Sequence, residues 1–170
     1  MSAGSIDLQE IVAMNLETLE KRLDRMESRL AIESLIWTYA QAYDRVDEAL
    51  LQSIWHVDAT LDLPGFGHGT GREGILAMAR ESWRKMPHMH HWMANPLIEL
   101  DGESATAISQ ADCLFHDIEQ GPVQAAGLYH DRFERRDGEW RFTERRFELM
   151  FLVPLQNWKP TAGSQAFARS

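Results

Sequence analysis

The sequence has 170 residues, 44% of them hydrophobic and 25% charged, which is enough for one soluble globular domain with its own core. Its net charge of −9 opposes binding to the phosphate backbone of nucleic acids. Its single cysteine, Cys113, excludes an internal disulfide and suits a reducing compartment.

The N-terminus shows no signal peptide, and no apolar run approaches the roughly 20 residues that a membrane-spanning helix needs. We therefore expect a soluble, cytoplasmic protein with neither nucleic acid nor membrane as a partner. The 6 tryptophans and 7 phenylalanines exceed what a small core needs, so several are candidates to line a cavity. For any single one of them, a place in the core is the more ordinary explanation.

The first predicted element is a long helix whose apolar residues alternate steps of three and four, as in a coiled-coil seam. These residues are Leu16, Leu19, Leu23, Met26 and Leu30. Charged residues fill the gaps between them. Such a helix either packs on another subunit or lies across its own domain, and the pattern favours neither. We treat residues 1–30 as an N-terminal helical extension.

A second helical segment, from about residue 32 to 45, carries one broad apolar face and places Asp44 at its C-terminal end. The elements expected next are a short helix at 47–55, a strand at 57–63, a glycine-rich loop at 64–71 and a helix at 72–85. Pro87 ends the last of these helices.

The remainder of the chain predicts four long strands, at residues 88–100, 104–118, 123–135 and 140–153. Because the connecting turns are short, neighbouring strands are expected to be antiparallel. In the last strand, Trp140 and Phe142 share one parity, whereas Phe147, Leu149 and Phe151 share the other. This switch of face predicts a bulge or a sharp bend.

Helices followed by long antiparallel strands predict an α+β domain. We expect a cone-shaped α+β barrel, with a strongly bent mixed or antiparallel sheet closed by the N-terminal helices. The interior of the cone is the expected ligand site. On this interpretation residues 31–153 form the cone domain. Residues 154–170 form a C-terminal tail, either a flexible flap or a cover over a pocket or a neighbour.

The most informative residues for function are Asp44 and His91. Asp44 follows Tyr39 and Tyr43 in an otherwise apolar helical run, where a buried carboxylate is costly unless something pairs with it. A carboxylate is also disfavoured at a helix C-terminus, which suggests a compensating purpose. Histidine is a natural partner, because it can pair with an acid and move protons near neutral pH. Alternatively, His91 is a hydrogen-bonded core histidine, or it is exposed beside His90.

Several motifs in this order resemble the SnoaL-like branch of the nuclear transport factor 2-like superfamily, over roughly residues 31–153. The motifs are the run Tyr39–Asp47, the glycine loop 68–75, the run Met89–Pro96, the hairpin 101–106 and the pair of segments 129–133 and 137–141. The resemblance implies the cone fold. It also implies similarity to cofactor-free lyases of this superfamily, namely bile acid 7α-dehydratase, scytalone dehydratase and hexachlorocyclohexane dehydrochlorinase.

The resemblance also implies roles for individual residues. Asp44 and His91 match the aspartate and histidine of the family's acid/base pair. Tyr39 and Tyr43 match tyrosines that precede the aspartate in the bile-acid and fungal enzymes, and either is also explained as an amphipathic core residue. A second family acid falls at Asp112 or its neighbour Cys113.

A further family histidine falls at Phe115 or His116. Because a slip of one residue reverses the face of a strand, the sequence leaves both positions open. We take as catalytic candidates His91, Asp44, Tyr39 and Asp112. The candidates for substrate binding are Tyr43, Trp55, Phe66, Trp92, His116 and Tyr129.

Other kinds of site have weaker support. His88, His90 and His91 cluster, but no recognised ligand spacing for a metal is present. The glycine-rich segment lacks the residues of a phosphate-binding loop, and no serine-nucleophile motif occurs. The arginines between Arg132 and Arg146 alternate with acids and suggest paired, solvated sheet edges. We therefore expect no metal and no cofactor.

Taken together, these features predict a cofactor-independent lyase, carrying out dehydratase-type elimination on a small apolar substrate, aromatic or polycyclic. An isomerase or cyclase using the same residue pair is the second possibility, and a non-catalytic ligand-binding or assembly module is the third. The resemblance and the apolar helix seam also predict a homo-oligomer, a trimer or a dimer.

Overall fold

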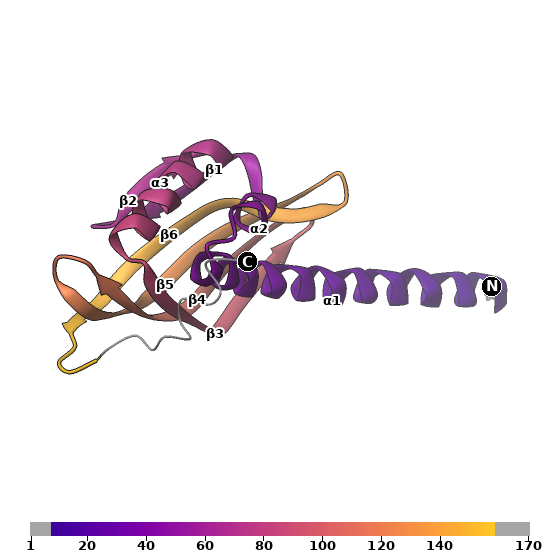
Figure 1. The fold of residues 1–170 in the computed structure, drawn as a ribbon. Helices are drawn as coiled ribbons and strands as arrows, with labels where there is room; N and C mark the ends of the chain where they lie inside the picture. Colours follow the sequence, from indigo (N-terminus) through magenta and orange to yellow (C-terminus); the bar gives the residue numbers. More distant parts are fainter. Residues whose placement is uncertain (1–7, 159–170) are drawn as a thin grey trace.

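The computed structural model describes residues 8–158. Its first element, α1 (Leu8–Arg45), is one continuous helix and not the two segments expected from the sequence. The reason is that no glycine or proline interrupts residues 8–45. Figure 1 shows that the N-terminal part of α1 extends well away from the sheet. The five seam residues are each more than half exposed, so they do not lie on their own domain.

The end of α1 is a sharp turn at Val46, which adopts a φ of 57°. In this left-handed conformation the Asp47 N–H donates to the Ala42 carbonyl at 2.9 Å, which closes the helix end. The Asp47 side chain then accepts from the Leu50 N–H and begins α2 (Glu48–Ser53). This turn fixes where Asp44, in the last turn of α1, can point.

A short hairpin follows, made of β1 (Trp55–Leu63) and β2 (Gly67–Thr70), which pair in antiparallel fashion. The loop expected at residues 64–71 therefore contains a strand. Its glycines also allow close packing, because a Cβ at Gly69 would lie 2.8 Å from the Ile75 Cα of α3 (Gly71–Lys85). Helix α3 covers this hairpin and places Ser82 and Met86 over the interior.

Three antiparallel pairings build the rest of the sheet, as the short turns predicted. The strands are β3 (His88–Asp101), β4 (Ser104–Asp117), β5 (Gly121–Arg136) and β6 (Glu139–Pro154). Strand β1 joins β6 in parallel, which gives a six-stranded mixed sheet with the order β2-β1-β6-β5-β4-β3. The sheet is not closed into a barrel: β2 and β3 are its two edges. Helices α1 and α3 complete the cone-shaped α+β fold (Figure 1).

The predicted switch of face in β6 is confirmed. Phe133 of β5 faces Phe142 and Arg132 faces Glu144, so Thr143 is an extra residue on β6. After this bulge the inward positions are Arg145 and Phe147. The bulge therefore bends the sheet and turns a charged side chain into the protein.

The core fills the space between the concave face of the sheet and the two longer helices. Ile32 and Ile36 of α1, Leu61 of β1, Ile75 of α3 and Phe142 of β6 are almost completely buried there. Within residues 8–158, no helix combines the length and the apolar character needed to cross a membrane.

Candidate functional site

The Asp44 carboxylate and the His91 imidazole meet at the junction of α1 and β3. The His91 Nδ1–H donates to Asp44 Oδ1 at 2.6 Å, and the His91 backbone N–H donates to Asp44 Oδ2 at 2.9 Å. The side chains are only 9% and 12% exposed. Because both carboxylate oxygens hold His91, its ring has a fixed orientation, with Nε2 as the remaining nitrogen for proton transfer.

His90 lies on the opposite face of β3 and is mostly exposed. Its Nδ1 is 3.5 Å from Asp44 Oδ2, and its ring packs edge-on against Trp92, with 4.3 Å between the ring centroids. The carboxylate is therefore flanked by two imidazoles. His91 is the one that turns inward, toward Tyr39 and Tyr43.

The charge state of His91 is set by opposing effects. Burial by itself lowers the pKa of the imidazole, but the neighbouring Cys113 and the hydrogen bond to Asp44 outweigh it and raise the pKa well above its usual value. Cys113 faces His91 directly across the β3–β4 pairing. The site therefore stabilises the imidazolium that forms when His91 accepts a proton.

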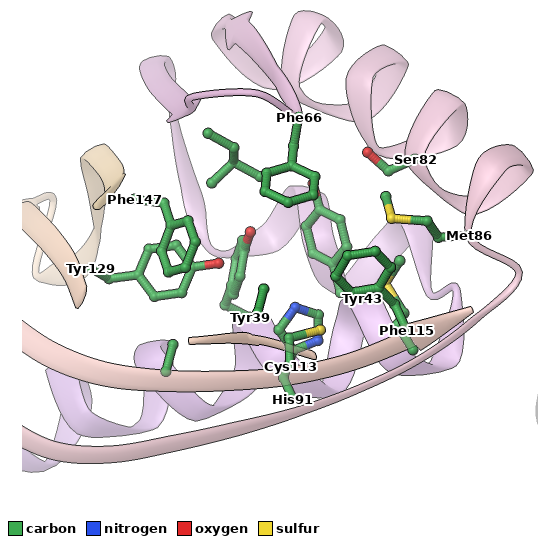
Figure 2. A pocket seen from close by; sticks show the side chains of 14 residues that line it. Tyr39, Tyr43, Phe66, Ser82, Met86, His91, Cys113, Phe115, Tyr129 and Phe147 are labelled. Carbon is green, nitrogen blue, oxygen red and sulfur yellow. The ribbon is translucent and has the colours of Figure 1, made fainter. Parts of the chain in front are cut away.

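His91 lies on the wall of a cavity that is partly open to solvent. Figure 2 shows the imidazole and the Cys113 sulfur at one side, with Phe66 and Ser82 across the space from them. The remaining walls are mostly apolar: Leu63, Met86, Met89, Ala111, Phe115, Ala125 and Phe147. Such a cavity suits a small, largely apolar ligand.

Three tyrosines provide most of the remaining polar atoms. Tyr39 packs against Tyr43 and Tyr129, with ring centroids 4.8 and 5.6 Å apart, and all three line the cavity. Burial raises the pKa of each, so their hydroxyls stay neutral and act as hydrogen-bond donors. The buried Tyr43 hydroxyl has no hydrogen-bond partner of ordinary geometry among the described residues.

A buried arginine lies behind these rings. The Arg145 guanidinium donates two 2.8 Å hydrogen bonds to the Asp131 carboxylate, and both side chains are 0% exposed. The guanidinium carbon lies 4.3 Å from the centre of the Tyr39 ring and 4.2 Å from that of Tyr129. A positive charge thus stands directly behind two cavity tyrosines.

This ion pair was not predicted from the sequence, because the arginines between Arg132 and Arg146 were interpreted as one solvated group. That description is wrong for Arg145. The signal was available: beyond the predicted switch of face, Arg145 shares the parity of Phe147, which lines the cavity. Applying the switch to every residue after Phe142 would have placed the arginine inside.

Four candidates lie away from the cavity. Asp112 is exposed and accepts a hydrogen bond from Gln124, because its neighbours Ala111 and Cys113 take the inward positions of β4. His116 lies on the same outer face, beside Trp158, while Phe115 points inward. Trp92 is 48% exposed on β3. Because side chains alternate between the two faces of a strand, these three residues point away from the cavity and do not line it as predicted.

Trp55, the fourth, is completely buried, but it lies in the core behind Tyr39. Its ring packs edge-on against Tyr39 and closely against Phe142. The remaining candidates, His91, Tyr39, Tyr43, Phe66 and Tyr129, all line the cavity, and Asp44 holds His91. Among residues 8–158, no group of three or more His, Cys, Asp or Glu side chains gathers in a way that could hold a metal ion.

Comparison with known proteins gives a consistent picture. Residues 24–146 match the model of the SnoaL-like domain family. A gamma-hexachlorocyclohexane dehydrochlorinase from Sphingobium indicum is 32% identical over 136 residues, covering 78% of this chain and 87% of that protein. The hexachlorocyclohexane dehydrochlorinase 1 from another strain of that species is 30% identical over the same length, covering 78% of this chain and 88% of that protein.

Solved structures show the same similarity. A crystal structure of a type 3 hexachlorocyclohexane dehydrochlorinase from Novosphingobium barchaimii has a TM-score of 0.78 and 29% identity, covering 82% of this chain and 99% of that one. Dehydrochlorinases are lyases, so these relatives support an enzyme of lyase type.

Proposed function

The chain belongs to the SnoaL-like domain family, and from that premise we propose that it is a cofactor-independent lyase using His91 and Asp44 as its acid/base pair. The reaction is a β-elimination on a small, largely apolar molecule with a carbocyclic or aromatic ring. The observation that carries the proposal is the 2.6 Å hydrogen bond that orients His91 on the wall of an apolar cavity.

The reaction begins at His91. Nε2 takes a proton from a carbon of the substrate, and the electron pair of that C–H bond forms a C=C double bond. The bond to the leaving group breaks, and the leaving group departs with its electron pair. Asp44 stabilises the imidazolium that results, which lowers the energy of the charge-separated transition state.

The tyrosines and Arg145 act on the leaving group. A hydroxyl donor from Tyr39 or Tyr43 bonds to the departing atom as negative charge develops on it. The guanidinium behind the Tyr39 and Tyr129 rings favours that charge from a short distance through a dry environment. Hydroxyl groups of this kind can donate a hydrogen bond to either an oxygen or a halogen as the leaving atom.

The cavity also sets the substrate class. Apart from His91, Ser82, Cys113 and the tyrosines, its walls are hydrocarbon or aromatic, so an ionised substrate would lose its hydration without compensation. The curated relatives are named for a chlorinated cyclohexane, which is a ring of this type. We extend the proposal to ring compounds that lose chloride or water.

The test uses two probes, γ-hexachlorocyclohexane and a cyclic β-hydroxy ketone. Chloride is followed by ion chromatography, and loss of water by the absorbance of the conjugated enone. We expect the wild-type protein to turn over at least one probe, and His91→Gln to do so at least about 100-fold more slowly. Binding of both probes without elimination of either would instead indicate a binding module and would overturn the proposal.

A further inference from the structure

The N-terminal half of α1 carries an apolar stripe that is largely exposed to solvent. The stripe, which we call the α1 seam, consists of Val12, Leu16, Leu19, Leu23, Met26 and Leu30, each between 49% and 62% exposed. Figure 1 shows this part of the helix extending away from the sheet. Six large apolar side chains in one exposed line are uncommon on a surface that stays in water.

The spacing of the seam is that of a coiled coil. Its residues alternate steps of four and three, which defines a heptad with Leu16, Leu23 and Leu30 at position a and with Leu19 and Met26 at position d. The seam spans roughly five helical turns. It buries little against a flat surface, but it interlocks with an identical seam on another helix.

Between residues 12 and 30, most contacts of α1 with its own domain lie on the other side of the helix, and Arg29, beside the seam, also donates to the Ile98 carbonyl of β3 at 3.0 Å. Asp24 pairs with Arg135 of β5 at 2.5 Å, and Ser28 is 4% exposed against the domain. These residues occupy heptad positions b and f, away from the a and d seam. The domain therefore leaves the seam accessible along its whole length.

The charges beside the seam indicate the direction of the partner helix. Glu20 and Glu27 occupy position e, and Arg22 and Arg29 occupy position g. In a parallel, in-register pair, position g of one helix meets position e of the next heptad on the other, so Arg22 faces Glu27 of the second copy. An antiparallel pair would instead place glutamate beside glutamate and arginine beside arginine.

We propose that residues 12–30 of α1 form a parallel, in-register coiled coil with the same helix of a second copy of this chain. The association buries the seam and stabilises a helix that, as an isolated segment of roughly 20 residues, would be marginal in water. It also ties two cavities into one assembly without covering either of them.

Disulfide trapping tests the register. In a Cys113→Ser background, Leu16→Cys brings two thiols together across position a of a parallel pair, so mild oxidation should give a covalent dimer. Lys21→Cys, at position f on the side of the helix away from the seam, is the matched control and should stay monomeric on a denaturing gel. Circular dichroism checks that both variants keep their helix.

The other outcomes of this trapping experiment overturn the proposal. If Leu16→Cys forms no dimer alone but forms one when mixed with Met26→Cys, which lies at position d, the helices are antiparallel. Failure of both to cross-link would show that the seam does not meet a second copy. Equal cross-linking of Leu16→Cys and Lys21→Cys would show random collision rather than a defined seam.

A charge exchange tests the role of the flanking residues. Arg22→Glu places two glutamates opposite one another in the parallel pair, so we expect roughly five- to tenfold weaker association by sedimentation equilibrium. Adding Glu27→Arg to the same chain restores opposite charges and should restore the association. Absence of that rescue would contradict the parallel register.

Discussion

Two pairs of ionisable side chains are buried within residues 8–158, and they differ in what they leave accessible. Arg145 and Asp131 are sealed at 0% exposure, with both carboxylate oxygens occupied by one guanidinium. Asp44 and His91 are nearly as buried, at 12% and 9%, but the imidazole forms part of the cavity wall. Burial by itself therefore does not mark a site; access to a reacting molecule does.

The two pairs also differ in what they can exchange. A guanidinium stays protonated at every working pH, so the Arg145–Asp131 pair contributes a fixed charge. An imidazole has two ring nitrogens, and one of them remains for substrate when Asp44 holds the other. The sealed pair should therefore govern stability and affect turnover only through its fixed charge behind the tyrosines, whereas the accessible pair should govern mainly turnover.

The largest expected effect is on turnover at the accessible pair. His91→Gln and Asp44→Asn should each lower kcat/KM by about 10²–10⁴-fold, because positioned acid/base catalysis contributes that much. Steady-state kinetics with a probe that the wild-type protein turns over provides the measurement, and urea unfolding provides the control. If either variant keeps wild-type kinetics, the substituted residue takes no part in the mechanism.

The next effect is on stability at the sealed pair. Asp131→Asn leaves the Arg145 charge buried without its counter-ion, so the free energy of unfolding should fall by about 3–5 kcal/mol. Urea denaturation measures it. The double variant Asp131→Asn with Arg145→Met, which removes the charge, should recover much of the loss. If the double variant is less stable than Asp131→Asn, the buried charge is not the cause.

A smaller effect concerns the pH dependence of the accessible pair. Cys113 and Asp44 raise the pKa of His91, so the neutral, proton-accepting imidazole appears only as the pH rises through that raised value. Activity should therefore increase with pH above the usual histidine range. Cys113→Ala removes one cause of the raised pKa of His91. The rising limb of the pH–activity profile should therefore move to lower pH.

Nuclear magnetic resonance titration of the His91 imidazole measures the same pKa without turnover. The Cys113→Ala variant should again give a lower value than the wild-type protein. If the rising limb of the pH–activity profile stays in place while the pKa of His91 falls, the rate-limiting proton transfer does not involve His91.

The sequence predicted most of the fold, because its signals are local and repeated. Antiparallel strands followed from short turns, and the bulge at Thr143 followed from a change of parity along one strand. Strand β2 was not predicted, because a glycine-rich run carries no alternation of side chains to indicate pairing. The continuous α1 was divided only because its apolar face changes direction near residue 31.

The candidate site was less predictable, because it depends on register between distant strands. The sequence left Asp112 or Cys113 open, and only the pairing of β3 with β4 shows that Cys113 faces His91. Trp55 and Trp92 are aromatic like several cavity residues, but residue type alone does not indicate to which face of a strand a side chain points. To predict that Arg145 points inward, the change of parity at the bulge must be followed to the next inward position of the strand.

The smallest expected effect lies at the turn that holds Asp44 in place. Val46 is a β-branched residue at a φ of 57°, a conformation that glycine adopts without steric cost. Val46→Gly should therefore stabilise the protein by about 1 kcal/mol, measured by urea unfolding. Because the helix-closing hydrogen bond from Asp47 to Ala42 uses backbone atoms only, kcat/KM should stay within about twofold of wild type. A stability gain accompanied by a large loss of turnover would mean that the strained valine itself fixes the position of Asp44. The turn would then contribute to turnover, as Asp44 and His91 do.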